Sequence, residues 1–111
     1  MVKGEKFINC GLINVRGYSN NRTAVEELLN KEELDVVVCT ETWLHKSISC
    51  PIKTYNVFDA LARKDNGSCG IRMFIKKRIR SFDSISIEDY MIIVRIVTKR
   101  NKHIFLIGVY F

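Results

Sequence analysis

The sequence predicts an α+β layer fold, with one helix near the start and strands along the rest of the chain. Three observations support this prediction. A strand–helix–strand pattern occupies the first forty residues, alternating apolar and polar positions follow, and the chain ends in two apolar runs separated by a polar break. At 111 residues, the chain is one small domain or a piece of a larger one.

The strand–helix–strand pattern can be assigned residue by residue. Residues 7–15 are rich in Ile, Leu and Val and end at a turn, so they predict a strand. Residues 19–21 supply helix-capping side chains, and Thr23 with Glu26 forms an alternative capping box for the same helix. The β-branched run at 34–39 predicts a strand buried on both faces. A crossover of this kind normally joins parallel strands, with the helix packed on the sheet.

The remaining elements are predicted to be strands. Residues 55–58 form a short apolar run, and residues 65–68 give a turn signal. Residues 71–76 and 82–87 alternate, which favours strands with one buried face, and residues 90–98 and 102–110 predict a hairpin. The sequence stops within its last apolar run. An exposed apolar strand leaves an edge open to pairing, and natural domains seldom end in one. We therefore expect that the chain is cut short, rather than that another element covers this edge.

Composition excludes several classes of protein. The chain is 47% hydrophobic and 27% charged with one Pro, which excludes a disordered chain. No apolar run is long enough to span a bilayer, and the first residues contain no signal core, so we expect an intracellular protein, cytoplasmic or nuclear. The cysteines are too far apart for a zinc finger and are expected to be reduced, with Cys10 and Cys39 in the core.

Charge is unevenly distributed along the chain. The formal net charge is +6, and the segment 63–80 carries seven bases against Asp65 alone. Such a stretch fits a polyanionic partner such as nucleic acid, although an ordinary solvated surface fits it equally well.

Two polar residues follow the first two predicted strands. Asn14 ends the first strand, and Glu41 follows the second. If the strands are parallel neighbours, both side chains reach the carboxyl edge of the sheet, where open α/β sheets bind ligands. A carboxylate there can hold Mg²⁺, and an amide beside it can orient a phosphate or an attacking water. Taken alone, Glu41 is more often a solvated loop carboxylate.

Four motifs in order resemble the endonuclease/exonuclease/phosphatase superfamily. They are Asn-Val-Arg-Gly at 14–17, Leu-Asp-Val-Val-Val-Cys-Thr-Glu-Thr-Trp-Leu at 34–44, the basic, glycine-containing stretch at 63–71 and Gly-Val-Tyr at 108–110. The Glu-Thr-Trp-Leu form is most similar to endonucleases of jockey- and CR1-type non-LTR retrotransposons, which accompany a reverse transcriptase. The resemblance covers residues 7–111 and suggests the amino-terminal half of such a domain.

The resemblance implies a fold, a reaction and a set of residues. The fold is two packed β-sheets flanked by helices, and the reaction is Mg²⁺-assisted hydrolysis of a phosphodiester in DNA. By match, Asn14 orients phosphate or water, Glu41 ligates the metal and Tyr110 contacts phosphate. Arg16, Arg63 and Lys64 are the candidate DNA contacts. Two of these residues have an ordinary structural alternative. Tyr110 could be a core aromatic residue, and Arg16 could be a turn residue.

The sequence also departs from the family pattern. The later Asp-x-Asn and Ser-Asp-His motifs are absent, and Cys69-Gly70 stands in place of a double glycine. His45 and His103 lie in other contexts. We therefore expect the chain to be inactive alone; the alternatives are a non-catalytic nucleic-acid-binding module and a structural remnant. We also expect the last apolar strands to lack part of their covering layer and to self-associate through residues 103–111. The residues concerned are Ile92, Val94, Ile96, Ile104, Leu106 and Val109.

Overall fold

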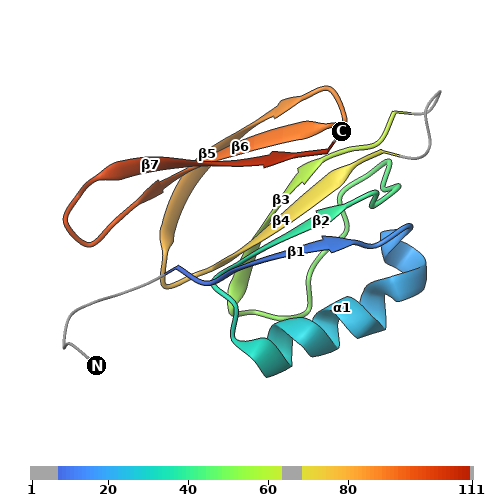
Figure 1. Cartoon of the computed structure of the whole chain (residues 1–111), viewed down its shortest axis with the longest axis horizontal. Coiled ribbons are helices and arrows are strands. Elements are labelled where there is room, and N and C mark those ends of the chain that lie inside the picture. Colours follow the sequence, from blue (N-terminus) through green and yellow to red (C-terminus); the bar gives the residue numbers. More distant parts are fainter. Residues whose placement is uncertain (1–7, 64–68, 111) are drawn as a thin grey trace.

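The computed structural model describes residues 8–63 and 69–110. In these residues the elements are β1 (Cys10–Asn14), α1 (Tyr18–Glu32), β2 (Val36–Thr40), β3 (Tyr55–Ala60), β4 (Ile71–Lys76), β5 (Arg80–Ile87), β6 (Met91–Val97) and β7 (His103–Val109). One sheet has the order β1-β2-β4-β3 and the other the order β5-β6-β7. The sheets stack face to face, and α1 covers the outer face of the first sheet (Figure 1). The predicted α+β, two-sheet fold class is therefore confirmed.

The crossover through α1 makes β1 and β2 parallel neighbours. Their register runs from Cys10 opposite Val36 to Asn14 opposite Thr40. The prediction of a parallel pair with the helix packed on the sheet is confirmed, and it has a direct consequence. Residues that follow β1 and β2 emerge at the same edge of the first sheet, on the right of Figure 1.

The predicted helix cap is wrong. The helix begins at Tyr18 with Gly17 as its N-cap, and no side chain caps it. The amides of Gly17 and Tyr18 instead donate to the carbonyls of Glu41 and Thr42, each at 2.8 Å. Because the loop after β2 satisfies these donors, residues 19–23 need not cap the helix. In the part of the chain that the structure describes, no helix is long and apolar enough to cross a membrane.

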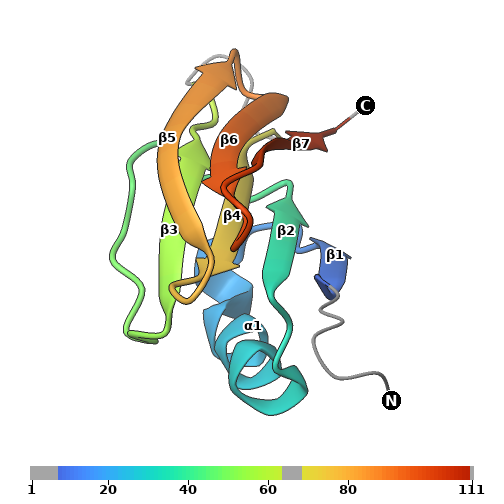
Figure 2. The same cartoon turned by 90° about the vertical axis from the view of Figure 1, so that its left-hand side faces the viewer.

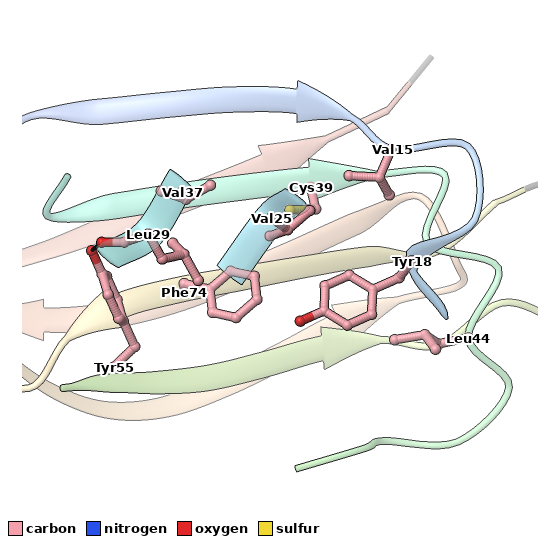
Figure 3. Close-up of a cluster of buried hydrophobic side chains, with 9 residues drawn as sticks. All are labelled: Val15, Tyr18, Val25, Leu29, Val37, Cys39, Leu44, Tyr55 and Phe74. Atoms are coloured by element: carbon pink, nitrogen blue, oxygen red, sulfur yellow. Dashed lines mark hydrogen bonds between the residues drawn. The ribbon is translucent and has the colours of Figure 1, made fainter. Parts of the chain in front are cut away.

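Strand β4 is buried on both faces, whereas its alternation predicted one buried face. Ile71, Met73 and Ile75 belong to the core between the two sheets. Phe74 points the other way and lies among residues of α1 and β3 in the core beneath the helix (Figure 3). The reason is position: β4 pairs with β2 on one side and β3 on the other, and a layer covers each face.

The second sheet buries one face and exposes the other. Ile92, Val94 and Ile96 of β6 are buried against the first sheet, so the expectation that they lack cover is wrong. The uncovered apolar residues lie on the opposite face, where β5 and β7 flank β6 (Figure 2). They include Ile85, Ile87, Phe105 and Ile107. Ile104, which pairs with Ile96 and was also expected to lack cover, is 39% exposed.

The cysteines do not all behave as predicted. Cys39 is buried, and burial raises the pKa of its thiol to about 12. Cys10, expected in the core, is exposed on the edge strand β1. An edge strand has no neighbour on one side, so an apolar run does not guarantee that all its side chains are covered. The cysteines form no disulfide in the part of the chain that the structure describes.

Candidate functional site

Asn14 and Glu41 meet at the carboxyl edge of the first sheet. The Asn14 amide nitrogen donates to Glu41 Oε2 at 2.5 Å. The parallel register explains the contact, since Asn14 is the last residue of β1 and Glu41 follows the last residue of β2. The predicted convergence of the two side chains is confirmed.

Tyr110 reaches the same place from the second sheet. It follows β7, and its backbone amide donates to the carbonyl of Tyr90 at 2.9 Å, which fixes the end of the strand. The nearby Glu41 carboxylate is the main reason why the pKa of Tyr110 lies above its ordinary value, while the positive charge of Arg16 acts to lower it. Side chains from both sheets therefore lie near Glu41.

The backbone around these residues adopts a sparsely populated conformation. Arg16, Glu41 and Trp43 have positive φ angles of 46°, 55° and 60°. Each such residue costs on the order of 1–3 kcal/mol and persists only when its surroundings hold it. Here the loop after β1 and the loop after β2 hold each other, through the bond from the Gly17 amide to the Glu41 carbonyl. Three strained residues in two touching loops are typical of a functional site.

Gly70 shows why the third motif needs a glycine. Its φ is +108°, and a Cβ there would lie 2.5 Å from the Thr42 hydroxyl oxygen. Its carbonyl accepts from the Thr42 amide at 3.1 Å, and its amide donates to the Asp89 carbonyl at 2.9 Å. Gly70 therefore links the loop carrying Glu41 to the β5–β6 turn. Cys69 occupies the other position of the double glycine, and its carbonyl accepts from the Trp43 amide at 3.0 Å.

The cationic residues that were predicted to contact DNA lie in different surroundings. Arg16 is exposed in the loop after β1, next to the Asn14–Glu41 pair. Arg63 forms an ion pair with Glu88 in the β5–β6 turn, so part of its charge is neutralised. Lys64 lies outside the described residues. Arg16 is thus the predicted cation whose charge the structure places beside Tyr110 and Glu41.

Sequence reasoning missed two residues near this edge. Asp89 is buried, and among the described residues its Oδ2 has no hydrogen-bond partner. In the sequence it is one polar residue in a turn, which gives no sign of burial. Trp43 is 39% exposed in the loop after β2. Its ring atoms Cε3 and Cζ3 would lie 2.8 and 2.9 Å from a Cβ at Gly17, so only a glycine fits beneath it.

The residues present fit a magnesium ion that uses one protein carboxylate. Mg²⁺ keeps several waters and is usually bound by one or two carboxylates together with phosphate oxygens. Glu41 offers one such carboxylate, and the hydrogen bond from Asn14 holds its orientation, with Tyr110 close by. Within residues 8–63 and 69–110, no three His, Cys, Asp or Glu side chains gather into a metal-binding group.

Comparison with solved structures identifies the fold. The catalytic domain of APE2 from Xenopus laevis matches with a TM-score of 0.66 at 18% identity, over 89% of this chain and 43% of that chain. An AP endonuclease from Archaeoglobus fulgidus matches with a TM-score of 0.68 at 16% identity, over 94% of this chain and 41% of that chain. The AP endonuclease LMAP from Leishmania major gives 0.66 at 17% identity, over 89% and 38%. The chain has the fold of these AP endonucleases.

The extent of the match is limited in two ways. The chain spans less than half the length of each of these three structures. Identities of 16–18% carry the fold and no more. The sequence matches no protein-family model and no curated protein.

Proposed function

We propose that the chain is the amino-terminal half of a Mg²⁺-dependent endonuclease domain that cleaves phosphodiesters in DNA, of the kind carried by non-LTR retrotransposons. The observation that carries this proposal is the meeting of Asn14, Glu41 and Tyr110 at one edge of the sandwich. The fold supports it, because two of the matched structures are named as AP endonucleases. The Glu-Thr-Trp-Leu motif at 41–44 supports the retrotransposon assignment.

The chain's own residues have distinct tasks in this proposal. Glu41 supplies a negative oxygen ligand, and its carboxylate is held in one orientation by the donor on Asn14, with Tyr110 close by. Arg16 adds a positive charge that attracts a phosphate to the same edge. Mg²⁺, when bound, would neutralise phosphate charge and polarise a phosphoryl oxygen. The Tyr110 hydroxyl, near the same carboxylate, contacts the phosphate in this proposal.

The same site is incomplete for hydrolysis. The Asp-x-Asn and Ser-Asp-His motifs, which in the resembling family complete the site, are absent from the sequence. A positioned general base contributes on the order of 10²–10⁴-fold to the rate. We therefore propose that the 111-residue chain binds DNA without cleaving it. The second candidate is a non-catalytic nucleic-acid-binding module, which rests on the same basic residues. A structural remnant would neither bind nor cleave DNA.

Two further parts of the proposal concern location and assembly. We place the protein inside the cell, in the cytoplasm or nucleus, where nucleic acid is found. We also propose that copies of the chain associate through β7, the edge strand of the second sheet.

The proposal predicts Mg²⁺-dependent DNA binding without nicking. A fluorescently labelled oligonucleotide should bind more tightly when Mg²⁺ replaces EDTA, and Glu41→Gln should remove that gain because the amide is a poor Mg²⁺ ligand. Glu27→Gln, which changes an exposed carboxylate on α1, is the matched control and should behave as the wild type. Fluorescence anisotropy measures the binding, and supercoiled plasmid reports nicking.

Each outcome has a clear meaning. Binding that is indifferent to Mg²⁺ and to Glu41→Gln would favour the non-catalytic module. Absence of DNA binding under both conditions would favour the remnant. Nicking of the plasmid by the wild type, lost in Glu41→Ala, would show that the site is complete and would overturn the proposed inactivity.

A further inference from the structure

Trp43 is an exposed aromatic residue beside the Asn14–Glu41 pair. It lies two residues after Glu41, and 39% of it remains exposed. Exposing a large indole forfeits the free energy that burial would give, since burial of apolar surface is favourable. A ring that stays exposed in a loop of otherwise well-bonded backbone is therefore a candidate contact surface.

The ring is held in place from below and along its backbone. Gly17 lies so close to it that any side chain there would collide with ring atoms Cε3 and Cζ3. The Trp43 amide donates to the Cys69 carbonyl at 3.0 Å, and the neighbouring Thr42 amide donates to Gly70. Because the backbone is fixed at a φ of 60°, the ring loses little freedom when a ligand stacks on it.

The surroundings of the ring favour a nucleobase as its partner. Arg16, whose charge can bind phosphate, precedes the glycine on which the ring packs. The polar pair Asn14 and Glu41 lies on the same two loops. An aromatic face beside a cationic and polar site is how proteins bind strands with unpaired bases, because the bases stack on the ring and the phosphates meet the charge. The net charge of +6 fits the same partner.

We propose that Trp43 is a base-stacking platform, and that the strand engaged at Asn14 and Glu41 presents an unpaired base to it. The substrate class is thus single-stranded, bulged or locally opened nucleic acid rather than a fully paired duplex. This inference rests on the proposed function, because the Asn14–Glu41 edge sets where the backbone of the strand lies.

The sole tryptophan of the chain makes the test direct. A single-stranded oligonucleotide should quench the fluorescence of Trp43, and a fully paired duplex of the same sequence should quench it much less. Trp43→Leu should weaken single-strand binding about 5- to 150-fold, which corresponds to stacking of one base, and Trp43→Phe should recover much of the loss. An oligonucleotide whose sites are all abasic should bind the wild type and Trp43→Leu equally.

A control variant and the contrary outcomes complete the design. Phe105→Leu removes an exposed aromatic ring on β7 and should leave single-strand binding unchanged. Equal binding of single strands by the wild type and Trp43→Leu would overturn the inference, as would equal weakening toward the abasic strand. If Trp43→Leu weakens binding while Glu41→Gln leaves its Mg²⁺ dependence intact, the platform stands and the proposed nuclease site fails. The reverse pattern rejects the platform alone.

Discussion

Asp59→Asn is expected to lower the free energy of unfolding by about 3–5 kcal/mol, because it leaves a buried guanidinium without its counter-ion. Arg72 is 0% exposed in its side chain and Asp59 5%. Arg72 Nε and Nη2 donate to the two Asp59 oxygens at 2.8 and 2.9 Å. The guanidinium also lies 4.8 Å from the centre of the ring of Tyr18, the first residue of α1. Removing the counter-ion of Arg72 should therefore also disturb the packing beneath α1.

The second sheet offers a matched control for this variant. Asp83 pairs with Arg95 at 3.0 Å, but their side chains are 68% and 33% exposed. An exposed pair contributes about 0–1 kcal/mol, so Asp83→Asn should change stability little. Urea denaturation followed by circular dichroism measures both. The total stability of a domain is about 5–15 kcal/mol, so the Asp59 variant should unfold at a much lower urea concentration than the wild type. Equal, small losses in the two variants would contradict the assignment of Asp59 and Arg72 as a buried pair that stabilises the fold.

The wild-type chain is expected to self-associate, and Phe105→Lys is expected to make it largely monomeric. In the described residues β7 pairs with β6 on one side only, and its central residues are apolar. Such an edge is a template for another strand, and a lysine on it is a common way to prevent pairing. The exposed apolar residues of the outer face add to the tendency.

The variant Ile85→Lys distinguishes strand pairing at the β7 edge from non-specific association of exposed apolar surface. Ile85 and Phe105 are 62% and 61% exposed on the same face, but Ile85 lies on β5, the other edge. That edge carries a register shift between Ser81 and Ser84, which makes regular pairing harder. Sedimentation velocity over a concentration series should show association in Ile85→Lys and its loss in Phe105→Lys. A wild type that is monomeric throughout and unfolds in one cooperative step would contradict both the open edge and the fragment account.

The first part of the fold was predictable because its signals are local. A strand, a helix and a buried strand in succession follow the right-handed crossover rule, so the sequence alone could place Asn14 and Glu41 at one edge of the sheet. The start of the helix could not be predicted, because the donors that fix it bond to carbonyls after β2. Capping side chains inside the helix are a weaker signal than a loop that arrives from elsewhere in the chain.

The pairing of β4 with β3 could not be predicted from local sequence patterns. Arg72 reads as the polar member of an alternating strand, yet Asp59 stands opposite it on the neighbouring strand. Only that cross-strand partner explains how an arginine can be buried. Tyr110 entered the site through family resemblance alone, because nothing in its strand indicates contact with Glu41. The burial of Asp89 and the partner of the Trp43 ring, Gly17, could not be predicted for the same reason: they depend on loops that are distant in sequence.

The central claim is that Glu41, oriented by Asn14 and close to Tyr110, binds a divalent cation at this edge. Paramagnetic broadening by Mn²⁺ in a ¹⁵N-labelled sample tests it most directly, because Mn²⁺ accepts the same oxygen ligands as Mg²⁺. The account predicts that a low concentration of Mn²⁺ broadens the amide signals of the loops after β1 and β2, together with those of Gly70 and Tyr110. The substitution Glu41→Gln should abolish this broadening. Broadening centred on the acidic residues of α1, Glu26 and Glu27, and unchanged in Glu41→Gln, would contradict it.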